Sequence, residues 1–196
     1  MEPAFETRST LQRMSDAADK LQRRLLRATR ALTAAGIPHA VAGGNAVAAH
    51  VARVDATMTR STQDVDLLVN RSDLPRIVDA LAAAGFTHRH AKGLDLFLDG
   101  PGASVREGVH LVFAAEVIRP EHPLPSPPVA LDAEESQFPL TELGALVILK
   151  LNSNRRKDQV HLLDLIAVGL VDETWPARIP PPLRGRLQDL LDDPDG

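Results

Sequence analysis

The chain has 196 residues and no cysteine, and its 22 lysine and arginine residues against 26 aspartate and glutamate residues give a formal net charge of −4. This length fits one domain, or one domain with an appendage, and the missing cysteines exclude a disulfide scaffold, a thiolate zinc site and a cysteine nucleophile. Aromatic residues make up only 3% of the chain, which argues against a base-stacking surface for single strands.

The N-terminal segment predicts a helix rather than a targeting signal. It lacks the apolar stretch of a secretion signal, and no run approaches the roughly 18 to 20 apolar residues of a membrane span. We therefore expect a cytoplasmic protein without membrane contact. Apolar residues recur three and four positions apart from Leu11 to Leu32 and predict a helix that ends at Gly36. Its many arginines indicate a solvated face or a face that contacts phosphate.

Short apolar segments then alternate with helical patterns as far as residue 114. One helix is predicted directly after Gly43-Gly44, over 45–52, and another over 72–84, with Ser72 as its N-cap and Gly85 after its end. Strands are predicted over 37–42, 64–69, 86–90, 94–98 and 109–114. The pattern predicts an α+β fold, a small mixed sheet with flanking helices.

The second half of the chain is predicted to be helical. Five of the nine residues from 120 to 128 are proline, which requires extended backbone. We place a linker at 120–139, between an α+β domain over 1–119 and a helical part over 140–196 that packs on the first domain and completes its site. The predicted helices there cover 141–151, capped by Thr141, then 158–168, and a last amphipathic helix after Pro180-Pro181-Pro182.

A glycine pair, Gly43-Gly44, stands between the first predicted strand and the following helix. Glycine lets the backbone approach a ligand closely, and a helix N-terminus offers free N–H groups to a phosphate. An ordinary tight turn uses the same residues, so the pair alone leaves both interpretations open.

Asp64 and Asp66 begin the second predicted strand, which continues as Leu67, Leu68 and Val69. Residues two apart on a strand face the same way, so the two carboxylates lie side by side. Like charges so placed raise one another's pKa unless a cation lies between them. The pair therefore indicates a site for Mg²⁺, although a solvent-exposed strand end would also tolerate two acids.

Lys150 and Asp164 are charged residues on otherwise apolar helix faces. Lys150 shares the face of Leu143, Leu146 and Val147, and Asp164 stands among leucines. The two residues either form an ion pair between helices, or Lys150 points into a cleft that binds an anion. Both interpretations can hold together.

Gly43-Gly44, a helix, and then Thr62-x-Asp64-x-Asp66 resemble the signature of the polymerase-β-type nucleotidyltransferase superfamily. The blocks 149–151, 155–158 and 164–166 resemble its AbiEii/MenT-type toxin branch, and the resemblance extends over 37–168. It implies a nucleotidyltransferase fold and phosphoryl transfer, in which an acceptor hydroxyl attacks the α-phosphorus of a nucleoside triphosphate and pyrophosphate leaves. Asp64 and Asp66 would hold Mg²⁺ against the phosphates, and the Gly43-Gly44 turn would cradle them.

The toxin branch implies further roles. Its functional set maps onto Thr62, Asp64, Lys150 and Asp164, where Lys150 would neutralise triphosphate charge and Asp164 would orient that lysine or position the acceptor. Arg60 is a further candidate phosphate ligand. The candidate rim for an RNA backbone is Arg155, Arg156 and Lys157.

Two features depart from the superfamily pattern. The interval from Gly44 to Asp64 is long, which predicts an extra segment near 51–59. The third carboxylate is expected on a later strand, where this chain has His110, and Asp95 is the alternative acid if the preceding strand supplies it. With His110 as a ligand the site would favour Mn²⁺ over Mg²⁺, because magnesium prefers oxygen. Otherwise Asp164 would replace the third carboxylate, or the protein would be inactive.

Two functional hypotheses follow. The first is an enzyme that adds nucleotides to RNA, at the 3′ end of tRNA, as the toxin of a toxin–antitoxin system with a cognate antitoxin protein. The second is a catalytically degenerate module of the same fold that binds a nucleotide or a partner. A glycosyltransferase that uses Asp64 and Asp66 is a distant third, since the chain is short for one and the Lys150 block has no place in it.

Overall fold

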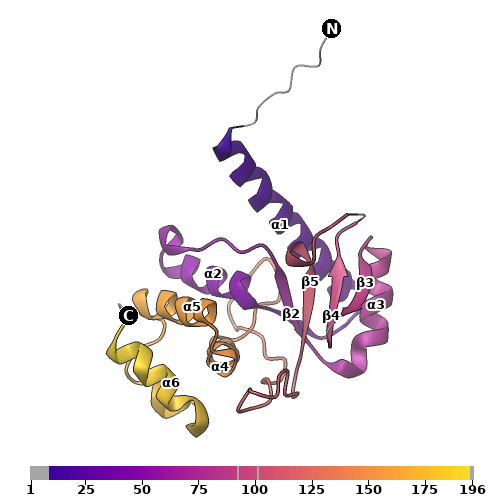
Figure 1. Ribbon diagram of the computed structural model, residues 1–196. Coiled ribbons are helices and arrows are strands. Elements are labelled where there is room, and N and C mark those ends of the chain that lie inside the picture. The colour runs from indigo at the N-terminus through magenta and orange to yellow at the C-terminus, as the bar shows by residue number, and fades with distance from the viewer. Residues whose placement is uncertain (1–8, 92, 101, 195–196) are drawn as a thin grey trace.

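The computed structural model describes residues 9–91, 93–100 and 102–194. A five-stranded sheet is flanked by helices, and a helical C-terminal part lies beside it (Figure 1). The strands are β1 (His39–Ala42), β2 (Val65–Val69), β3 (Thr87–Ala91), β4 (Leu94–Leu98) and β5 (Val109–Phe113). The helices are α1 (Thr10–Ala34), α2 (Gly43–Val54), α3 (Leu74–Ala83), α4 (Leu143–Ser153), α5 (Arg156–Ala167) and α6 (Pro181–Asp192).

The sheet has the order β1-β2-β5-β4-β3, in which β2 and β5 are parallel and the other neighbours are antiparallel. The predicted α+β fold with a mixed sheet is therefore confirmed. Ala42 on β1 pairs with Asp66 on β2, and Asp66 pairs with His110 on β5. Three strands thus bring the end of β1, a carboxylate and an imidazole into one row.

The sheet separates two packing layers. Leucine, valine and phenylalanine side chains on one face pack against Leu25, Ala28 and Leu32 of α1 and against Ile77 and Leu81 of α3. The opposite face carries smaller side chains, including Ala40 and Ala42, with Leu149 of α4 packed against them. A second core joins α2 to the C-terminal helices. The small residues let α4 approach the sheet closely, next to the row that holds Asp66.

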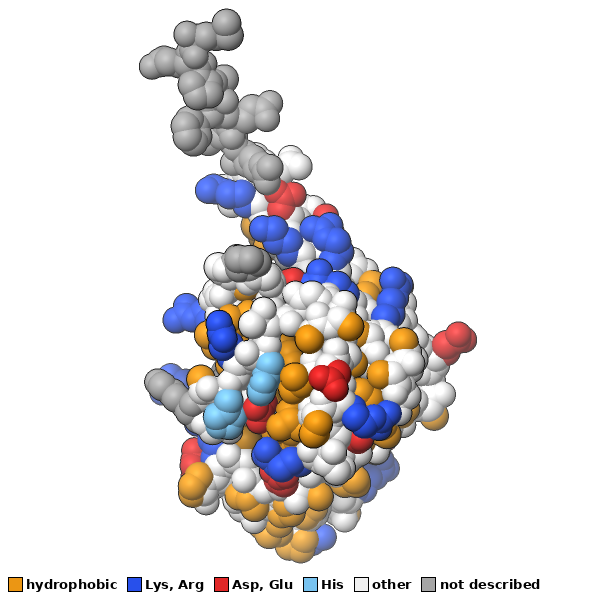
Figure 2. All heavy atoms as spheres, turned by 90° about the vertical axis from the view of Figure 1, so that its right-hand side faces the viewer, with side chains coloured by type: hydrophobic (Ala, Val, Ile, Leu, Met, Phe, Trp, Pro, Cys, Tyr) orange, Lys and Arg blue, Asp and Glu red, His pale blue; other side chains and the backbone are white. Residues whose placement is uncertain are grey.

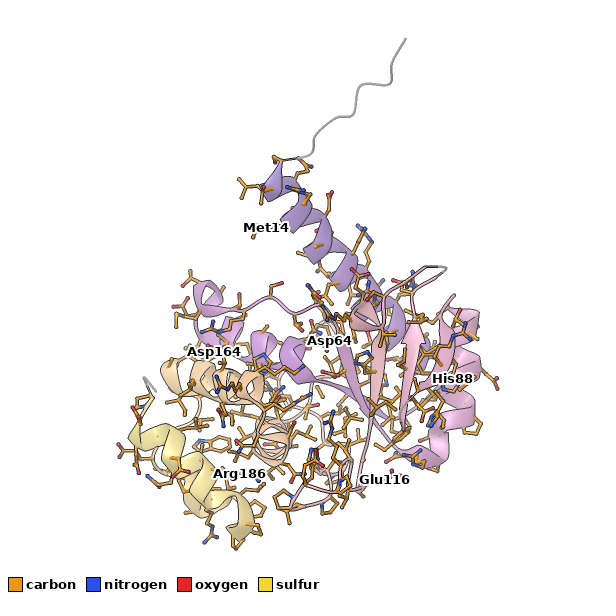
Figure 3. All side chains as sticks on the ribbon, viewed as in Figure 1. Met14, Asp64, His88, Glu116, Asp164 and Arg186 are labelled. Atoms are coloured by element: carbon orange, nitrogen blue, oxygen red, sulfur yellow. The ribbon has the colours of Figure 1, made fainter. Side chains whose placement is uncertain are left out.

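Helix α1 packs on the sheet only along its C-terminal half. Its N-terminal half extends beyond the body of the protein, where Met14 is labelled (Figures 1 and 3). Leu11 and Met14 are 78% and 64% exposed there. None of the described helices combines the length and apolar character needed to cross a membrane.

Several helix starts differ from the sequence prediction. Helix α2 begins at Gly43 itself, so the glycine pair forms its first turn. Ser72 lies in a short 3₁₀ turn, Arg71–Asp73, and does not cap α3, which begins at Leu74. The last helix was predicted to begin after Pro180-Pro181-Pro182. Instead, prolines 181 and 182 form the first turn of α6, where a missing N–H costs little.

The predicted cap of α4 is also wrong. The carboxylate of Glu142 accepts hydrogen bonds from the N–H groups of Gly144 and Ala145 and caps the helix. Thr141 instead donates its hydroxyl to the carbonyl of Val41 at 2.7 Å. Thr141 is fully buried beside β1, and there its hydroxyl needs a partner in the sheet.

Candidate active site

The glycine pair is required by close approach rather than by an ordinary turn. Gly43 has a φ of +65°, and a Cβ at this position would lie 1.9 Å from Oδ2 of Asp66. A Cβ on Gly44 would lie 3.0 Å from Cβ of Thr62 and 3.4 Å from Cε1 of His161. The start of α2 therefore sits directly against Thr62 and Asp66, where only glycine fits without displacing them.

The N-terminus of α2 supplies hydrogen-bond donors at this point. Its N-cap is Ala42, whose side chain has no acceptor atom. The first N–H groups of this 12-residue helix have no partner within the helix and lie at the positive end of its dipole. Asn45, in the same turn, donates its Nδ2 to the backbone oxygen of Asp64 at 2.7 Å. This bond fixes α2 to the start of β2.

Asp64 is held as an anion by its neighbours. Thr62 donates its hydroxyl to Oδ1 of Asp64 at 2.7 Å, and Nζ of Lys157 lies 3.9 Å from Oδ2. Burial opposes ionisation, but the bond from Thr62 and the charge of Lys157 outweigh it, so the pKa of Asp64 lies below its ordinary value.

Asp66 has the opposite environment. Burial and the adjacent charge of Asp64 raise the pKa of Asp66, and the opposing charges of Lys150 and His110 do not cancel them. Ligand atoms of Asp64, Asp66 and His110 all lie within 4.8 Å of one another, and no other group of three such residues occurs among the described residues. After burial, repulsion from Asp64 is the next cause of the raised pKa of Asp66, so the neighbouring cations do not fully balance the two carboxylates.

His110 is oriented so that one nitrogen is free for a cation. Its Nε2 lies 2.8 Å from the backbone carbonyl of Val105. Since a carbonyl only accepts, Nε2 carries the proton, and in the neutral ring Nδ1 is left with a lone pair. Nδ1 lies 3.9 Å from Oδ1 of Asp66. Two carboxylates and an oriented imidazole lone pair fit a divalent cation, and the bond to Val105 is the kind of outer contact that orients metal-binding histidines.

Lys150 projects from α4 into the same region. The residue is 5% exposed, and its Nζ lies 3.3 Å from Oδ1 of Asp158. Burial lowers the pKa of Lys150, while Asp158 and Asp66 partly restore it. Lys150, Asp66, His110 and Gly43 line one cavity of about 150 Å³. The lysine therefore places a cation next to the carboxylate cluster.

The predicted ion pair between Lys150 and Asp164 is wrong. Lys150 pairs with Asp158, and Asp164 accepts hydrogen bonds on both carboxylate oxygens from Nε of Arg60 at 2.8 Å. Two residues separate the end of α4 from the start of α5, so the first turn of α5, with Asp158, lies nearest Lys150. Asp164 is about 9 Å farther along α5. It therefore orients Arg60 rather than Lys150.

The three residues of the predicted basic rim have different surroundings. Lys157 lies beside Asp64, as described above. Nε of Arg155 donates to Asp158 at 2.7 Å. Burial opposes ionisation of Asp158, but Arg155 and Lys150 together lower its pKa to about 2. Arg156 is the exposed first residue of α5.

Asp95, the alternative third acid, belongs elsewhere. On β4 the partner of His110 is Leu96, so Asp95 faces the opposite side of the sheet. There it accepts hydrogen bonds from His88 and His90. Figure 3 shows His88 by the edge strand β3, away from Asp64 beside β2. The alternative strand is therefore excluded as a source of the third ligand.

Sequence analysis assigned no role in the site to three residues of this region: Asn45, His161, and Asp158, which it included only as part of the block 155–158. Asn45 directly follows the glycine pair, and Asp158 occupies the third position of α5, where capping boxes have an acid. His161 lies beside Gly44, and its Nδ1 is buried without a hydrogen-bond partner among the described residues. Burial, followed by the charge of Lys150, lowers the pKa of His161 to about 4. Unlike Asn45 and Asp158, His161 stands at no sequence position that marks it, because a histidine within a helical pattern can face either the site or the solvent.

Comparisons with known proteins agree with this geometry. The model of a family described as uncharacterised nucleotidyltransferase matches residues 2–138. None of the curated proteins matches the chain.

Two solved structures have a similar fold. One is a solution structure of the antibiotic-resistance factor ANT(2″)-Ia, described as revealing substrate-regulated conformation dynamics, with 16% identity and a TM-score of 0.57 over 88% of this chain and 93% of that chain. The other is a crystal structure of ANT(2″)-Ia in complex with adenylyl-2″-tobramycin, with 17% identity and a TM-score of 0.55 over 89% of this chain and 98% of that chain. At these identities the likeness concerns the fold.

Proposed function

Because the chain belongs to the family described as uncharacterised nucleotidyltransferase, we propose that it transfers a nucleoside monophosphate from a nucleoside triphosphate to a hydroxyl group of RNA. The cluster of Asp64, Asp66 and His110 carries the proposal. Its unbalanced negative charge, next to free N–H groups and a buried lysine, suits a cation bound to a polyphosphate.

A divalent cation is the expected cofactor. Asp64, Asp66 and His110 would hold Mg²⁺ or Mn²⁺, and the single nitrogen in this set is compatible with manganese. When bound, the ion neutralises phosphate charge and makes the α-phosphorus easier to attack.

The remaining residues bind and orient. Thr62 fixes one oxygen of Asp64, and Asn45 fixes its backbone. The N–H groups at the start of α2 and the ammonium of Lys150 would bind the triphosphate. Asp158 holds Lys150 in place and opposes the effect of burial, which lowers the pKa of that lysine. Arg60, held by Asp164, is a candidate contact for the outer phosphates.

The charge around the cluster favours an anionic acceptor. Lys157 lies beside Asp64, Arg156 is exposed one residue before it, and Arg155 lines the cavity that contains Lys150. A cationic acceptor would be repelled by these groups, whereas an RNA backbone would be attracted. The resemblance to AbiEii/MenT-type toxins makes the 3′ end of tRNA the first acceptor to test, and an antitoxin the expected protein partner.

The alternative is a module of this fold that binds a nucleotide without transferring it. The observation in its favour is His110, a neutral ligand where the superfamily is expected to have a third carboxylate. A cluster with less negative charge would hold its cation less tightly.

One experiment distinguishes the two. The full chain is incubated with each labelled nucleoside triphosphate, Mg²⁺ or Mn²⁺, and total RNA, alongside Asp64→Asn, Lys150→Ala and a surface control, Asp79→Asn on α3. We expect label on RNA with the wild type and the control, and none with Asp64→Asn. Nucleotide binding without any transfer would support the module, and transfer by Asp64→Asn at the wild-type rate would refute the proposed site.

A further inference from the structure

Helix α1 carries a row of basic side chains along one face. Arg13, Lys20 and Arg27 are seven residues apart, and Arg24 lies between the last two. Seven residues fall within about 20° of two full helical turns, so these side chains leave the helix on the same side. At about 1.5 Å per residue the row is about 21 Å long.

The inner end of the row is attached to the segment that leads into the candidate site. Arg24 is only 6% exposed. It donates Nη1 to the backbone oxygen of Gln63 at 3.2 Å and Nε to Asp99 at 3.3 Å. Arg27 pairs with the same aspartate. Gln63 directly precedes Asp64, so the row ends one residue away from the carboxylate cluster.

The outer part of the row borders a groove of about 300 Å³ between α1 and the segment 61–63. Arg13, Lys20 and Arg24 line it on one side, and Thr62 lines it on the other. Asp16 and Glu107 also border it. Since Thr62 donates its hydroxyl to Asp64, the groove opens next to the cluster.

The charge of α1 differs from that of the whole protein. The helix has six basic and two acidic residues, whereas acids are in excess over the entire chain. Figure 2 shows Lys and Arg side chains gathered along the extending helix above the body. The excess lies in the inner half, with four arginines and no acid, whereas the extending half has Arg13 and Lys20 against Asp16 and Asp19. A helix with a net charge of +4 that packs on the body along only half its length suits a partner that is long and anionic.

We propose that the basic row of α1 guides the backbone of the RNA acceptor along the groove to Asp64 and Asp66. The inference rests on the proposed function, because it takes RNA as the acceptor. A row of about 21 Å spans several phosphates of a strand, which is more than a small anionic acceptor offers. Lys157 and Arg156, on α5, would contact the same strand from the other side of the cluster.

The test compares two double variants of the full chain. Arg13→Gln with Lys20→Gln removes the outer half of the row. Arg23→Gln with Arg30→Gln removes the same charge from the same helix, about a quarter turn away. All four residues are exposed, and circular dichroism checks that the variants fold. Binding is measured by fluorescence anisotropy with a labelled single-stranded RNA of about 15 nucleotides, in salt from about 50 to 200 mM.

We expect the Arg13 and Lys20 variant to bind this RNA roughly tenfold more weakly, and the slope of log affinity against log salt to fall by about 1.4, since each phosphate contact on a single strand contributes about 0.7. The Arg23 and Arg30 variant should bind within about twofold of the wild type. Exchanging the two charges, Arg13→Lys with Lys20→Arg, should preserve binding. Equal losses in both double variants, or no loss in either, would overturn the inference.

Activity separates this inference from the proposed function. With RNA as acceptor, KM for RNA should be higher in the Arg13 and Lys20 variant than in the wild type, while KM for the nucleoside triphosphate should be the same in both. If the wild type transfers no nucleotide, the proposed function fails, while the salt dependence of RNA binding still tests the row. If transfer depends on Asp64 but KM for RNA is the same in both double variants, only the row is refuted.

Discussion

Two groups of carboxylates and histidines lie on the same sheet, and they differ in how their charges are balanced. On β2 and β5, Asp66 lies beside Asp64 and faces the free Nδ1 of His110, and burial and Asp64 raise its pKa. On β3 and β4, Asp95 is more buried, with a side chain 4% exposed against 22% for Asp66, but it accepts hydrogen bonds on Oδ1 from His88 at 2.9 Å and His90 at 3.0 Å. Burial opposes ionisation of Asp95, yet these bonds outweigh it and lower its pKa.

The surroundings of Asp95 explain why it stays structural. Arg71 lies 3.9 Å from its second oxygen, donates two hydrogen bonds to Glu116, and stacks over Phe113 at 3.7 Å. Histidine, acidic and basic side chains lie together on this face in Figure 2. One oxygen of Asp95 therefore accepts two hydrogen bonds, and the other lies near the guanidinium of Arg71. The comparison makes the first group the better candidate for a cation site, because the fold supplies fewer donors to its carboxylates.

The largest expected effect is loss of transfer without loss of stability in Asp66→Asn. The substitution removes the repulsion between Asp64 and Asp66, so the free energy of unfolding in chelator should stay equal or rise. Removing a group that holds the cation should lower kcat/KM at least about 10³-fold. Nucleotide transfer and urea unfolding measure the two quantities. A variant that is both active and less stable would mean that the first cluster is structural too.

The next effect concerns the close approach of the glycine pair. Gly43→Ala puts a Cβ against Asp66, whereas Gly36→Ala, at a φ of +61°, meets nothing within 4 Å. Both variants carry the strain of a left-handed alanine, about 1 kcal/mol. Only Gly43→Ala should also displace Asp66, with a further loss of about 2 kcal/mol and of most transfer activity. Equal unfolding energies and activities in the two variants would contradict the close approach.

A divalent cation should stabilise the wild type through the unbalanced cluster. At 100 times its Kd, an ion that binds only the folded state adds about 2.7 kcal/mol to the free energy of unfolding. Thermal unfolding with Mn²⁺ or Mg²⁺, before and after addition of chelator, measures this gain. Asp66→Asn should lose most of it, while Asp95→Asn should keep it. An equal gain in both variants would place the ion elsewhere.

Asp95→Asn should have the reverse profile of Asp66→Asn. The substitution weakens the acceptor shared by His88 and His90, and it removes one of the two negative charges beside the guanidinium of Arg71. We therefore expect a loss of about 2 kcal/mol in the free energy of unfolding. Transfer should stay within about twofold of the wild type at a temperature where the variant is folded. If the variant had normal stability and impaired nucleotide transfer, the functional site would lie at Asp95, His88 and His90 instead.

The two groups also show what could be predicted from the sequence. The alternation of apolar residues predicted the mixed sheet. The spacing of Asp64 and Asp66, with Leu67 to Val69 after them, predicted that the two carboxylates lie side by side. The charged residues on apolar faces, Lys150 and Asp164, marked helices that pack near the site. These signals are local, because strand and helix periods fix which side chains share a face.

The partners of those charges could not be predicted in the same way. Arg60 and Asp164 are 104 residues apart in the chain, and Lys150 meets Asp158 because of how α4 turns into α5. Pairings of this kind depend on how helices pack, which the period of either helix does not determine. The separate roles of Asp66 and Asp95 depend likewise on strand order, since β5, and not β4, lies next to β2.

The smallest expected effect distinguishes the histidines of the two regions. His88 and His90 have Asp95 as a shared acceptor, whereas Nδ1 of the half-buried His161 has no partner among the described residues and its pKa is lowered to about 4. Between about pH 6.5 and pH 4 the unfolded chain binds a proton at this histidine and the folded chain does not. The wild type therefore loses stability as the pH falls through this window. His161→Gln cannot take up this proton, so its free energy of unfolding should fall less than that of the wild type between about pH 7 and pH 5.

Urea unfolding at the two pH values measures this difference, which we expect to reach up to about 1 kcal/mol after allowance for the solvent screening of a half-exposed group. If variant and wild type differ by the same amount at both pH values, His161 has a partner in solution. The contrast between the two regions would then rest on Asp66 and Asp95 alone.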